Sequence, residues 1–246
     1  MKVLIIGASG QLGKVLSPYF PDSDKPSHIE LDLLHKTDID YYLAPRPYNR
    51  YDKVIVLAGV KNQDSIEKLG RDALRTNILG IGNVVDALFR VSGETKLVYV
   101  STEYVYPGTE GNYTENSPVL PKNKYIWSKI GAESCIHMMN EENYLIIRCA
   151  FSTKPWHRKD AYVDQWTSRE EVSVIAQKIA FLIKNDAFGT YNVGSKRTRL
   201  YDYASSISDS YIERAYLTDH RVPRDTSMCI DKYNDFVKEH TDAKVT

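Results

Sequence analysis

The sequence predicts an α/β protein built on a doubly wound parallel sheet, and three observations lead to that prediction. Short, unbroken apolar runs, typical of strands buried on both faces, recur through the first 150 residues. Segments with helical spacing of apolar residues alternate with these runs. A glycine-rich turn separates the first run from the first helical segment. Strands that alternate with helices in this way form parallel sheets with right-handed crossovers.

The elements of the first 150 residues follow from their apolar spacing and their turn residues. We expect strands at residues 3–6, 28–32, 53–58, 96–101 and 144–148. We expect helices that begin at Gln11 and that cover about 38–43, 72–91 and 125–139. The third of these helices would present one apolar face made of Leu74, Ile78, Ile81, Val85 and Leu88. Gly, Asn and Pro mark residues 108–123 as a loop.

Beyond residue 150 the alternation weakens. A helix is expected over 168–184, where Ser168 and Glu171 have the spacing of a capping box. A strand at 190–193 and short helices over 200–208 and 230–239 complete the expected elements. We therefore predict a sheet domain of residues 1–150, rejoined by about 168–195, and a small C-terminal lobe of residues 151–246 that is interleaved with it. Ligands of such sheets bind at the carboxyl ends of the strands, where this lobe is expected.

Composition narrows the function classes. The chain has 246 residues, with 32 basic and 32 acidic side chains, which argues against a generic binder of nucleic acid or of membrane surfaces. No apolar run reaches membrane-spanning length, and the N-terminus has the pattern of a strand, not of a signal peptide. The 3 cysteines are unclustered and the 6 histidines lack ligand spacing, so we expect a cytoplasmic protein with reduced thiols and no metal site.

The glycine turn predicts an anion site. Gly7, Gly10 and Gly13 lie between the first strand and a helix that begins at Gln11. Backbone N–H groups and the helix dipole can hold a phosphate there, and missing side chains let a pyrophosphate approach the backbone. The spacing is G-x-x-G-x-x-G, whereas the usual dinucleotide motif is G-x-G-x-x-G. A tight turn without a ligand is the alternative.

Two further patterns point to chemistry on a carbonyl group. Among the 18 tyrosines, only Tyr125 has a lysine four residues on, Lys129, so phenol and ammonium share one helix face. The ammonium lowers the pKa of the phenol and makes it a proton donor near neutral pH. Ser101 and Thr102 end the fourth strand, where a hydroxyl can bond a substrate carbonyl oxygen. The alternatives are an ordinary surface pair and a hydroxyl that caps the next turn.

These motifs, in this order and spacing, resemble the extended short-chain dehydrogenase/reductases. The chain is most similar to the dTDP-4-dehydrorhamnose reductase group, which has a related S-T-D-Y-V-F-x-G segment where this chain has Ser-Thr-Glu-Tyr-Val-Tyr-Pro-Gly from Ser101. The segments 30–33 and 54–59 also resemble that group, and Asn77 matches its helix asparagine. The resemblance covers about residues 1–150.

The resemblance implies a Rossmann-like domain and the reduction of a 4-keto group on a nucleotide-activated 6-deoxy sugar. Thr102, Tyr125 and Lys129 would be the catalytic residues, with Tyr125 as proton donor and Lys129 also on the nicotinamide ribose. The cofactor site would comprise Gly7, Ser9, Gly10, Gln11, Leu12, Gly13, Asp32, Leu33, Leu57, Ala58, Gly59, Asn77, Tyr125 and Lys129. The substrate would contact Thr102, Glu103, Phe151 and Arg224.

The cofactor is expected to be NADP, with NAD as the open alternative. By spacing from the glycines, Glu30 or Asp32 stands about where an acid bonds a ribose 2′-hydroxyl. The resemblance instead assigns Asp32 to the adenine side, and His35 and Lys36 could accept a 2′-phosphate. The resemblance allows a homodimer and does not fix the oligomeric state.

Three departures from the family pattern leave the function open. Ile126 replaces the usual small residue after the tyrosine, Glu103 replaces an aspartate, and the C-terminal part is several tens of residues shorter than usual. An epimerase with the same triad is one alternative. A non-catalytic NAD(P)-binding partner subunit, like the regulatory subunit of methionine adenosyltransferase, is another. A 4,6-dehydratase fits less well, because Tyr104 follows Glu103 where that subgroup has a second acid.

Overall fold

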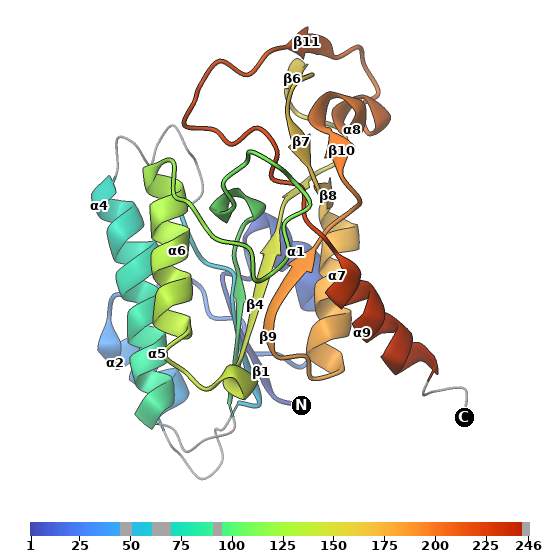
Figure 1. Cartoon of the computed structure of the whole chain (residues 1–246). Coiled ribbons are helices and arrows are strands. Elements are labelled where there is room, and N and C mark those ends of the chain that lie inside the picture. The colour runs from blue at the N-terminus through green and yellow to red at the C-terminus, as the bar shows by residue number, and fades with distance from the viewer. Residues whose placement is uncertain (45–50, 61–69, 91–94, 243–246) are drawn as a thin grey trace. The chain divides into compact units, whose positions relative to one another are not determined.

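The computed structural model describes residues 1–44, 51–60, 70–90 and 95–242 (Figure 1). Its central sheet has five strands in the order β1-β2-β3-β4-β9. These strands are Val3–Ile6, Lys53–Val56, Lys96–Val100, Tyr144–Cys149 and Gly189–Val193. β1 pairs with β2 and β2 with β3 in parallel register. The predicted α/β class with a parallel sheet is therefore confirmed.

The chain divides into two compact units. Unit 1 consists of residues 1–101, 124–146 and 186–189. Unit 2 consists of residues 102–123, 147–185 and 190–246. Each unit is described by itself below.

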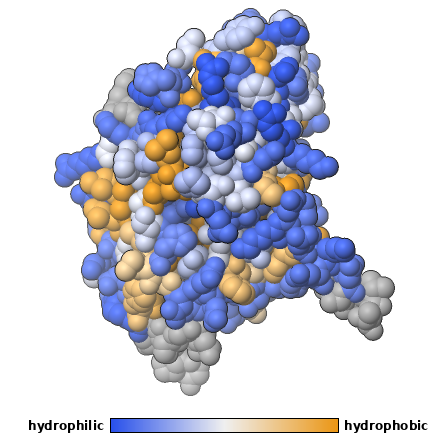
Figure 2. Space-filling view, viewed as in Figure 1, coloured by the Kyte–Doolittle hydropathy of each residue, from blue (hydrophilic) through white to orange (hydrophobic). Residues whose placement is uncertain are grey.

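Unit 1 contains the glycine turn and the predicted helices around it. Its helices are α1 (Gln11–Leu16), α2 (Lys36–Leu43), α4 (Gly70–Ala73), α5 (Gly80–Arg90) and α6 (Lys124–Ile136), with short 3-10 turns η1 (Ser17–Tyr19) and η4 (Glu141–Asn143). β1 and β2 are buried at every position, as unbroken apolar runs require. The exposed apolar side chains of this unit include Leu79, Phe89 and Trp127, and Figure 2 shows orange patches on the side of the molecule where α5 and α6 lie.

The strand predicted at residues 28–32 does not form, and this prediction was wrong. Ser27 instead organises a turn, because its carbonyl accepts the N–H groups of Glu30 and Leu31 and its own N–H bonds the Glu30 carboxylate. Ile29, at the second position of the expected strand, is almost fully exposed. The neighbour of β1 is instead an isolated β-bridge at Asp24, whose backbone N–H donates to the Val3 carbonyl and whose carbonyl accepts the Ile5 N–H.

The helix predicted at 72–91 is interrupted by a π-helical segment, η2 (Leu74–Leu79), between α4 and α5; residue 91 lies outside the described residues. A π turn holds an extra residue, so the faces before and after it are rotated relative to a regular helix. Ile81, Val85 and Leu88 are buried as expected, whereas Leu74 is exposed and the predicted face is wrong at that position. The segment also buries Asn77, which is 2% exposed.

Unit 2 consists of short strands and three longer helices. A 3-10 turn, η3 (Glu103–Val105), comes first. The two-stranded pairs are β5 (Phe151–Ser152) with β8 (Glu170–Glu171), β6 (Asp160–Tyr162) with β11 (Glu213–Ala215), and β7 (Trp166–Thr167) with β10 (Thr198–Arg199). The helices are α7 (Val172–Lys184), α8 (Leu200–Ser206) and α9 (Asp231–Asp242).

The capping box predicted from Ser168 and Glu171 is also wrong. α7 begins after Glu171, which caps it without a side-chain hydrogen bond. The Ser168 hydroxyl accepts the N–H of Met228 at 2.9 Å, so a distant segment of the chain takes the group that local spacing assigned to the helix. Ser168 is fully buried there.

Candidate functional site

The glycine turn of unit 1 is shaped by close backbone contacts. Gly7 has φ +91°, and a Cβ there would lie 2.6 Å from the Ala58 nitrogen. A Cβ at Gly13 would lie 2.5 Å from the carbonyl oxygens of Gly7 and Ala8. Gly10 is exposed, and its Cβ would meet only the Gly7 oxygen, at 3.3 Å. Gly7 and Gly13 are therefore required by the turn itself, whereas Gly10 keeps the exposed backbone bare.

A pocket of about 350 Å³ opens beside this turn, within unit 1. Its size lies in the range of small-molecule sites. It is lined by predicted cofactor residues from three segments of the chain, namely Gly7, Ser9, Asp32, Leu33, Ala58 and Gly59. Pro26 and His28 also line it, and no sequence motif marked them. The remaining predicted cofactor residues lie outside the lining: Gly10, Gln11, Leu12, Gly13, Leu57, Asn77, Tyr125 and Lys129.

The two acids that could bind a ribose hydroxyl, Asp32 and Glu30, lie in different surroundings. Asp32 lines the pocket, and one of its carboxylate oxygens accepts the Leu34 N–H at 2.9 Å. Glu30 is exposed and does not line the pocket; its bonds with Ser27 lower the pKa of its carboxyl. Of the two acids, Asp32 is therefore the one in place to meet a ribose.

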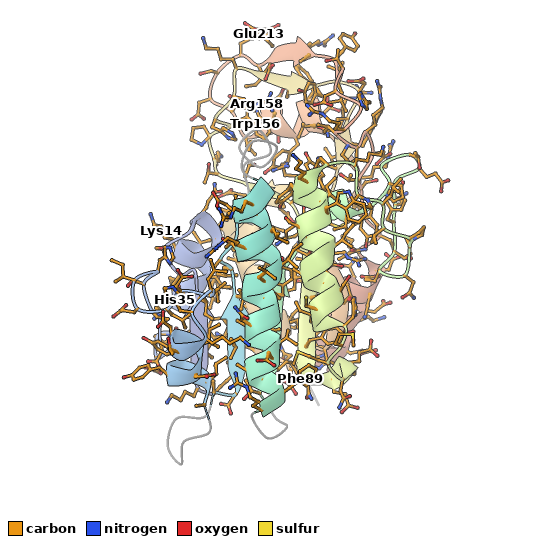
Figure 3. All side chains as sticks on the ribbon, turned by 90° about the vertical axis from the view of Figure 1, so that its left-hand side faces the viewer. Lys14, His35, Phe89, Trp156, Arg158 and Glu213 are labelled. Atoms are coloured by element: carbon orange, nitrogen blue, oxygen red, sulfur yellow. The ribbon has the colours of Figure 1, made fainter. Side chains whose placement is uncertain are left out.

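The basic side chains offered for a 2′-phosphate lie on the surface of unit 1. His35 pairs with Asp38 at 3.5 Å, and Lys36 pairs with Asp86 at 3.5 Å. Neither lines the pocket. Lys14 on α1 is exposed on the same side of unit 1 as His35 (Figure 3).

Helix α6 carries the predicted proton donor and its lysine. Tyr125 is partly buried in the first turn, and Lys129 follows one turn later with 8% exposure. The Lys129 Nζ donates to the Val100 carbonyl at 2.7 Å and lies 4.2 Å from the ring centre of Tyr99. The ammonium is therefore held against strand β3.

Asn77 joins the pocket loop to this helix. Its Oδ1 accepts the Val60 N–H at 2.8 Å, and its Nδ2 donates to the Val60 carbonyl at 3.0 Å. The same Nδ2 donates to the Ser128 hydroxyl at 2.9 Å, and that hydroxyl bonds the Tyr125 carbonyl at 2.8 Å. One buried amide thus fixes the segment that lines the pocket against the turn of α6 between Tyr125 and Lys129.

A second buried contact joins β3 to α6 further along. The Ser101 hydroxyl donates to the Glu133 carboxylate, and both residues are buried. Glu133 follows Lys129 by four residues and Tyr125 by eight, so the three share one helix face. No sequence motif singles out Glu133, because its partner Ser101 lies 32 residues away in the chain.

Thr102 and Glu103 open unit 2. The Thr102 hydroxyl accepts the Tyr104 N–H at 3.3 Å and so caps η3. Glu103 is fully buried, and its carboxylate accepts bonds from the Thr167 and Thr226 hydroxyls and from the Ser168 N–H. Burial raises the pKa of Glu103, although Arg169 and these bonds oppose the rise.

Phe151 and Arg224 lie elsewhere in unit 2. The Phe151 carbonyl accepts the Arg169 Nη1 at 2.6 Å. Arg224 is exposed and pairs with Asp164 at 2.6 Å. Within unit 2, strand β7 contacts the segments of both Glu103 and Arg224. The Thr167 hydroxyl donates to the Glu103 carboxylate, and the Trp166 N–H donates to the Arg224 carbonyl at 2.8 Å. Substrate contact by Thr102, Glu103, Phe151 and Arg224 stays a prediction.

In the part of the chain that the structure describes, no cluster of three or more His, Cys, Asp or Glu side chains is arranged to hold a metal ion. Along the same ranges, no helix is both long and apolar enough to cross a bilayer.

The parallel sheet, the glycine turn and the tyrosine–lysine helix define a protein of the extended short-chain dehydrogenase/reductase type. The chain belongs to the family described as RmlD substrate binding domain, which matches residues 1–181.

Two relatives show the range of functions around this chain. Methionine adenosyltransferase 2 subunit beta of Rattus norvegicus is 23% identical over 248 residues, which cover 85% of this chain and 72% of that protein. A dTDP-4-dehydrorhamnose reductase of Aggregatibacter actinomycetemcomitans is 26% identical over 148 residues, which cover 59% of this chain and 50% of that protein.

Solved structures establish the fold. The dTDP-4-dehydrorhamnose reductase from Bacillus anthracis, in complex with NADP, has a TM-score of 0.81 and 23% identity, covering 96% of this chain and 91% of that one. A dTDP-4-dehydrorhamnose reductase from Clostridium acetobutylicum has a TM-score of 0.79 and 20% identity, covering 100% of both chains.

Proposed function

We propose that this chain is an NADP-dependent reductase of a 4-keto group on a nucleotide-activated 6-deoxy sugar. The observation that supports it best is the Asn77 amide, which ties the pocket loop at Val60 to α6 between Tyr125 and Lys129. A dinucleotide pocket and a proton donor are useful together only if their spacing is fixed. We assign the dinucleotide to residues 1–150 and the sugar to the C-terminal lobe of residues 151–246, with Thr102 and Glu103.

The lining of the pocket in unit 1 supports the assignment of a dinucleotide to it. Gly7 and Ser9 bring the glycine turn to the pocket wall, and Asp32 offers a carboxylate to ribose hydroxyls. NADP is preferred over NAD because the related reductase from Bacillus anthracis was solved with NADP. When bound, the nicotinamide supplies the hydride.

Side chains of the protein itself would carry out the proton transfer. Tyr125 donates it to the substrate carbonyl oxygen, and the Lys129 ammonium stabilises the phenolate that remains. Lys129 would also hold the nicotinamide ribose. The proposed role of Thr102 is to donate a hydrogen bond to the same carbonyl oxygen. This role rests on the sequence motif.

Turnover of a dTDP-4-keto-6-deoxy sugar with NADPH tests the proposal. Tyr125→Phe keeps the ring and removes the proton, so kcat should fall by about a hundredfold to ten-thousandfold while NADPH binding survives. Tyr211→Phe is the matched control, because Tyr211 is 82% exposed. Near-parental turnover by Tyr125→Phe would exclude Tyr125 as the donor.

A partner subunit without catalysis is the second candidate. It is favoured by the match to methionine adenosyltransferase 2 subunit beta, which extends over 85% of this chain. A parent protein that binds NADPH, reduces no 4-keto sugar nucleotide and co-elutes with a methionine adenosyltransferase would support it. An epimerase would instead purify with NAD permanently bound and consume no added NADPH.

A further inference from the structure

Strand β3 presents the aromatic ring of Tyr99 to helix α6. Tyr99 is 1% exposed and packs in the same core cluster as Ala132 and Ile136 of α6. Side chains two residues apart on a strand share a face, so Tyr99 and Ser101 both point to α6. The Lys129 Nζ lies 4.2 Å from the Tyr99 ring centre, and Lys129 itself is 8% exposed. An ammonium over a ring face is attracted by the ring, more strongly where water is excluded.

The junction of β3 and α6 holds further polar contacts near this lysine. The Val100 carbonyl accepts a hydrogen bond from Nζ at 2.7 Å, and Glu133, one turn beyond Lys129, is anchored by the Ser101 hydroxyl. Burial raises the pKa of Tyr99 well above its usual value, and nearby Tyr125, Glu133 and Cys135 raise it further. The Tyr99 phenol therefore stays neutral at physiological pH.

We propose that Tyr99 is a positioning residue that acts through Lys129: its ring holds the ammonium against β3 and so sets the affinity for the dinucleotide. The inference rests on the proposed function, in which Lys129 holds the nicotinamide ribose. A lysine has a flexible four-carbon stem, so an ammonium that is already placed loses less freedom on binding. The ring face supplies this placement, and the Tyr99 hydroxyl is not required for it.

The NADPH dissociation constant, measured by calorimetry, separates the ring from the hydroxyl. Tyr99→Leu removes the ring face and should weaken binding about tenfold. Tyr99→Phe keeps the ring and should bind within about twofold of the parent, because the attraction comes from the ring face. Leu97→Val is the control for general loss of packing, since Leu97 is fully buried two residues earlier on β3.

A double variant shows whether Tyr99 acts through Lys129. Tyr99→Leu combined with Lys129→Met should bind NADPH no more weakly than Lys129→Met alone, because both changes remove one interaction. If Lys129→Met binds like the parent, the role of Lys129 in the proposed function fails. If Lys129→Met weakens binding while folded Tyr99→Leu does not, only the positioning inference fails.

A measurement without cofactor covers the case in which Tyr99→Leu does not fold. The Lys129 ammonium protons, assigned by their loss in Lys129→Met, should be shifted upfield by the Tyr99 ring in the NMR spectrum of the parent. Tyr99→Phe should keep that shift. An unshifted Lys129 ammonium signal in the parent would overturn the proposal.

Discussion

Asn77 and Ser128 lie 51 residues apart in the chain and are joined by a hydrogen bond of 2.9 Å from Nδ2 to Oγ. The same amide exchanges two hydrogen bonds with Val60. Its position in a π-helical segment fits this task, because such segments often occur at functional sites.

The first prediction concerns this amide. Asn77→Ala removes the partner of the half-buried N–H and carbonyl of Val60 and a donor to the buried Ser128 hydroxyl, at a cost of about 1–3 kcal/mol in the free energy of unfolding. NADPH binding should weaken as well, because the Val60 loop lines the pocket. Urea unfolding and calorimetry measure the two effects. Asn185→Ala, which removes an amide bonded to the Phe181 carbonyl, should leave NADPH affinity unchanged.

The second prediction separates two kinds of glycine. Gly10→Val should leave the melting temperature near the parental value and abolish NADPH binding, because its side chain would cover exposed backbone without a severe clash. Gly7→Ala should lower the free energy of unfolding by about 1–3 kcal/mol, because φ is +91° there. Thermal unfolding with and without NADPH distinguishes them. A folded Gly10→Val that binds like the parent would refute the pyrophosphate cradle.

The third prediction follows from the raised pKa of buried Glu103. In the unfolded chain this carboxyl ionises near pH 4.5, whereas the folded protein keeps the proton to higher pH. The folded state then binds more protons between the two values, so this group's contribution to stability falls as the pH rises above 4.5. Glu103→Gln cannot ionise and should gain stability relative to the parent across that window.

Urea unfolding of both proteins at a series of pH values measures this difference. Glu110→Gln is the control, because Glu110 is exposed in the same unit. A difference between Glu103→Gln and the parent that stays constant with pH would contradict the assignment.

The fourth prediction concerns Asp186, which accepts bonds from both Lys53 and Lys96. Burial alone would raise the pKa of Asp186, but the two lysines bring it below its usual 3.8. Asp186→Ala leaves two nearly buried ammonium groups without a carboxylate, but Asp186 itself is exposed and solvent screens the pairs, so the cost should be about 1 kcal/mol of stability near neutral pH. This contribution should disappear in acid, as the pH falls below 3.8 and the parental carboxyl is protonated. An equal loss at acidic and neutral pH would argue against the ion pair.

Much of the fold was predictable because its strands are unbroken apolar runs that no local alternative competes with. The strand expected at 28–32 failed where a local alternative exists, since Ser27 and Glu30 bond each other and hold a turn. The capping box failed for the opposite reason, because Ser168 is taken by Met228, 60 residues away. Both errors arise from polar side chains, whose partners a spacing rule cannot identify.

For the candidate site, too, only the residues with a characteristic spacing could be predicted from the sequence. Sequence motifs marked Tyr125, Lys129 and the glycines, because their spacing alone implies a shared face or a bare turn. Tyr99 and Glu133 carried no such signal, since an apolar strand position and a helix glutamate are ordinary in isolation. They became meaningful only when β3 and α6 brought Tyr99 beneath Lys129 and Ser101 beside Glu133.

The division into units also limits how this chain can be cut or recombined. The chain passes from one unit to the other after residues 101, 123, 146, 185 and 189. Neither unit is therefore a contiguous stretch that could be expressed alone, and no single crossover point exchanges one unit for that of a relative. Exchanging one unit for that of a relative therefore needs a junction at each of these positions.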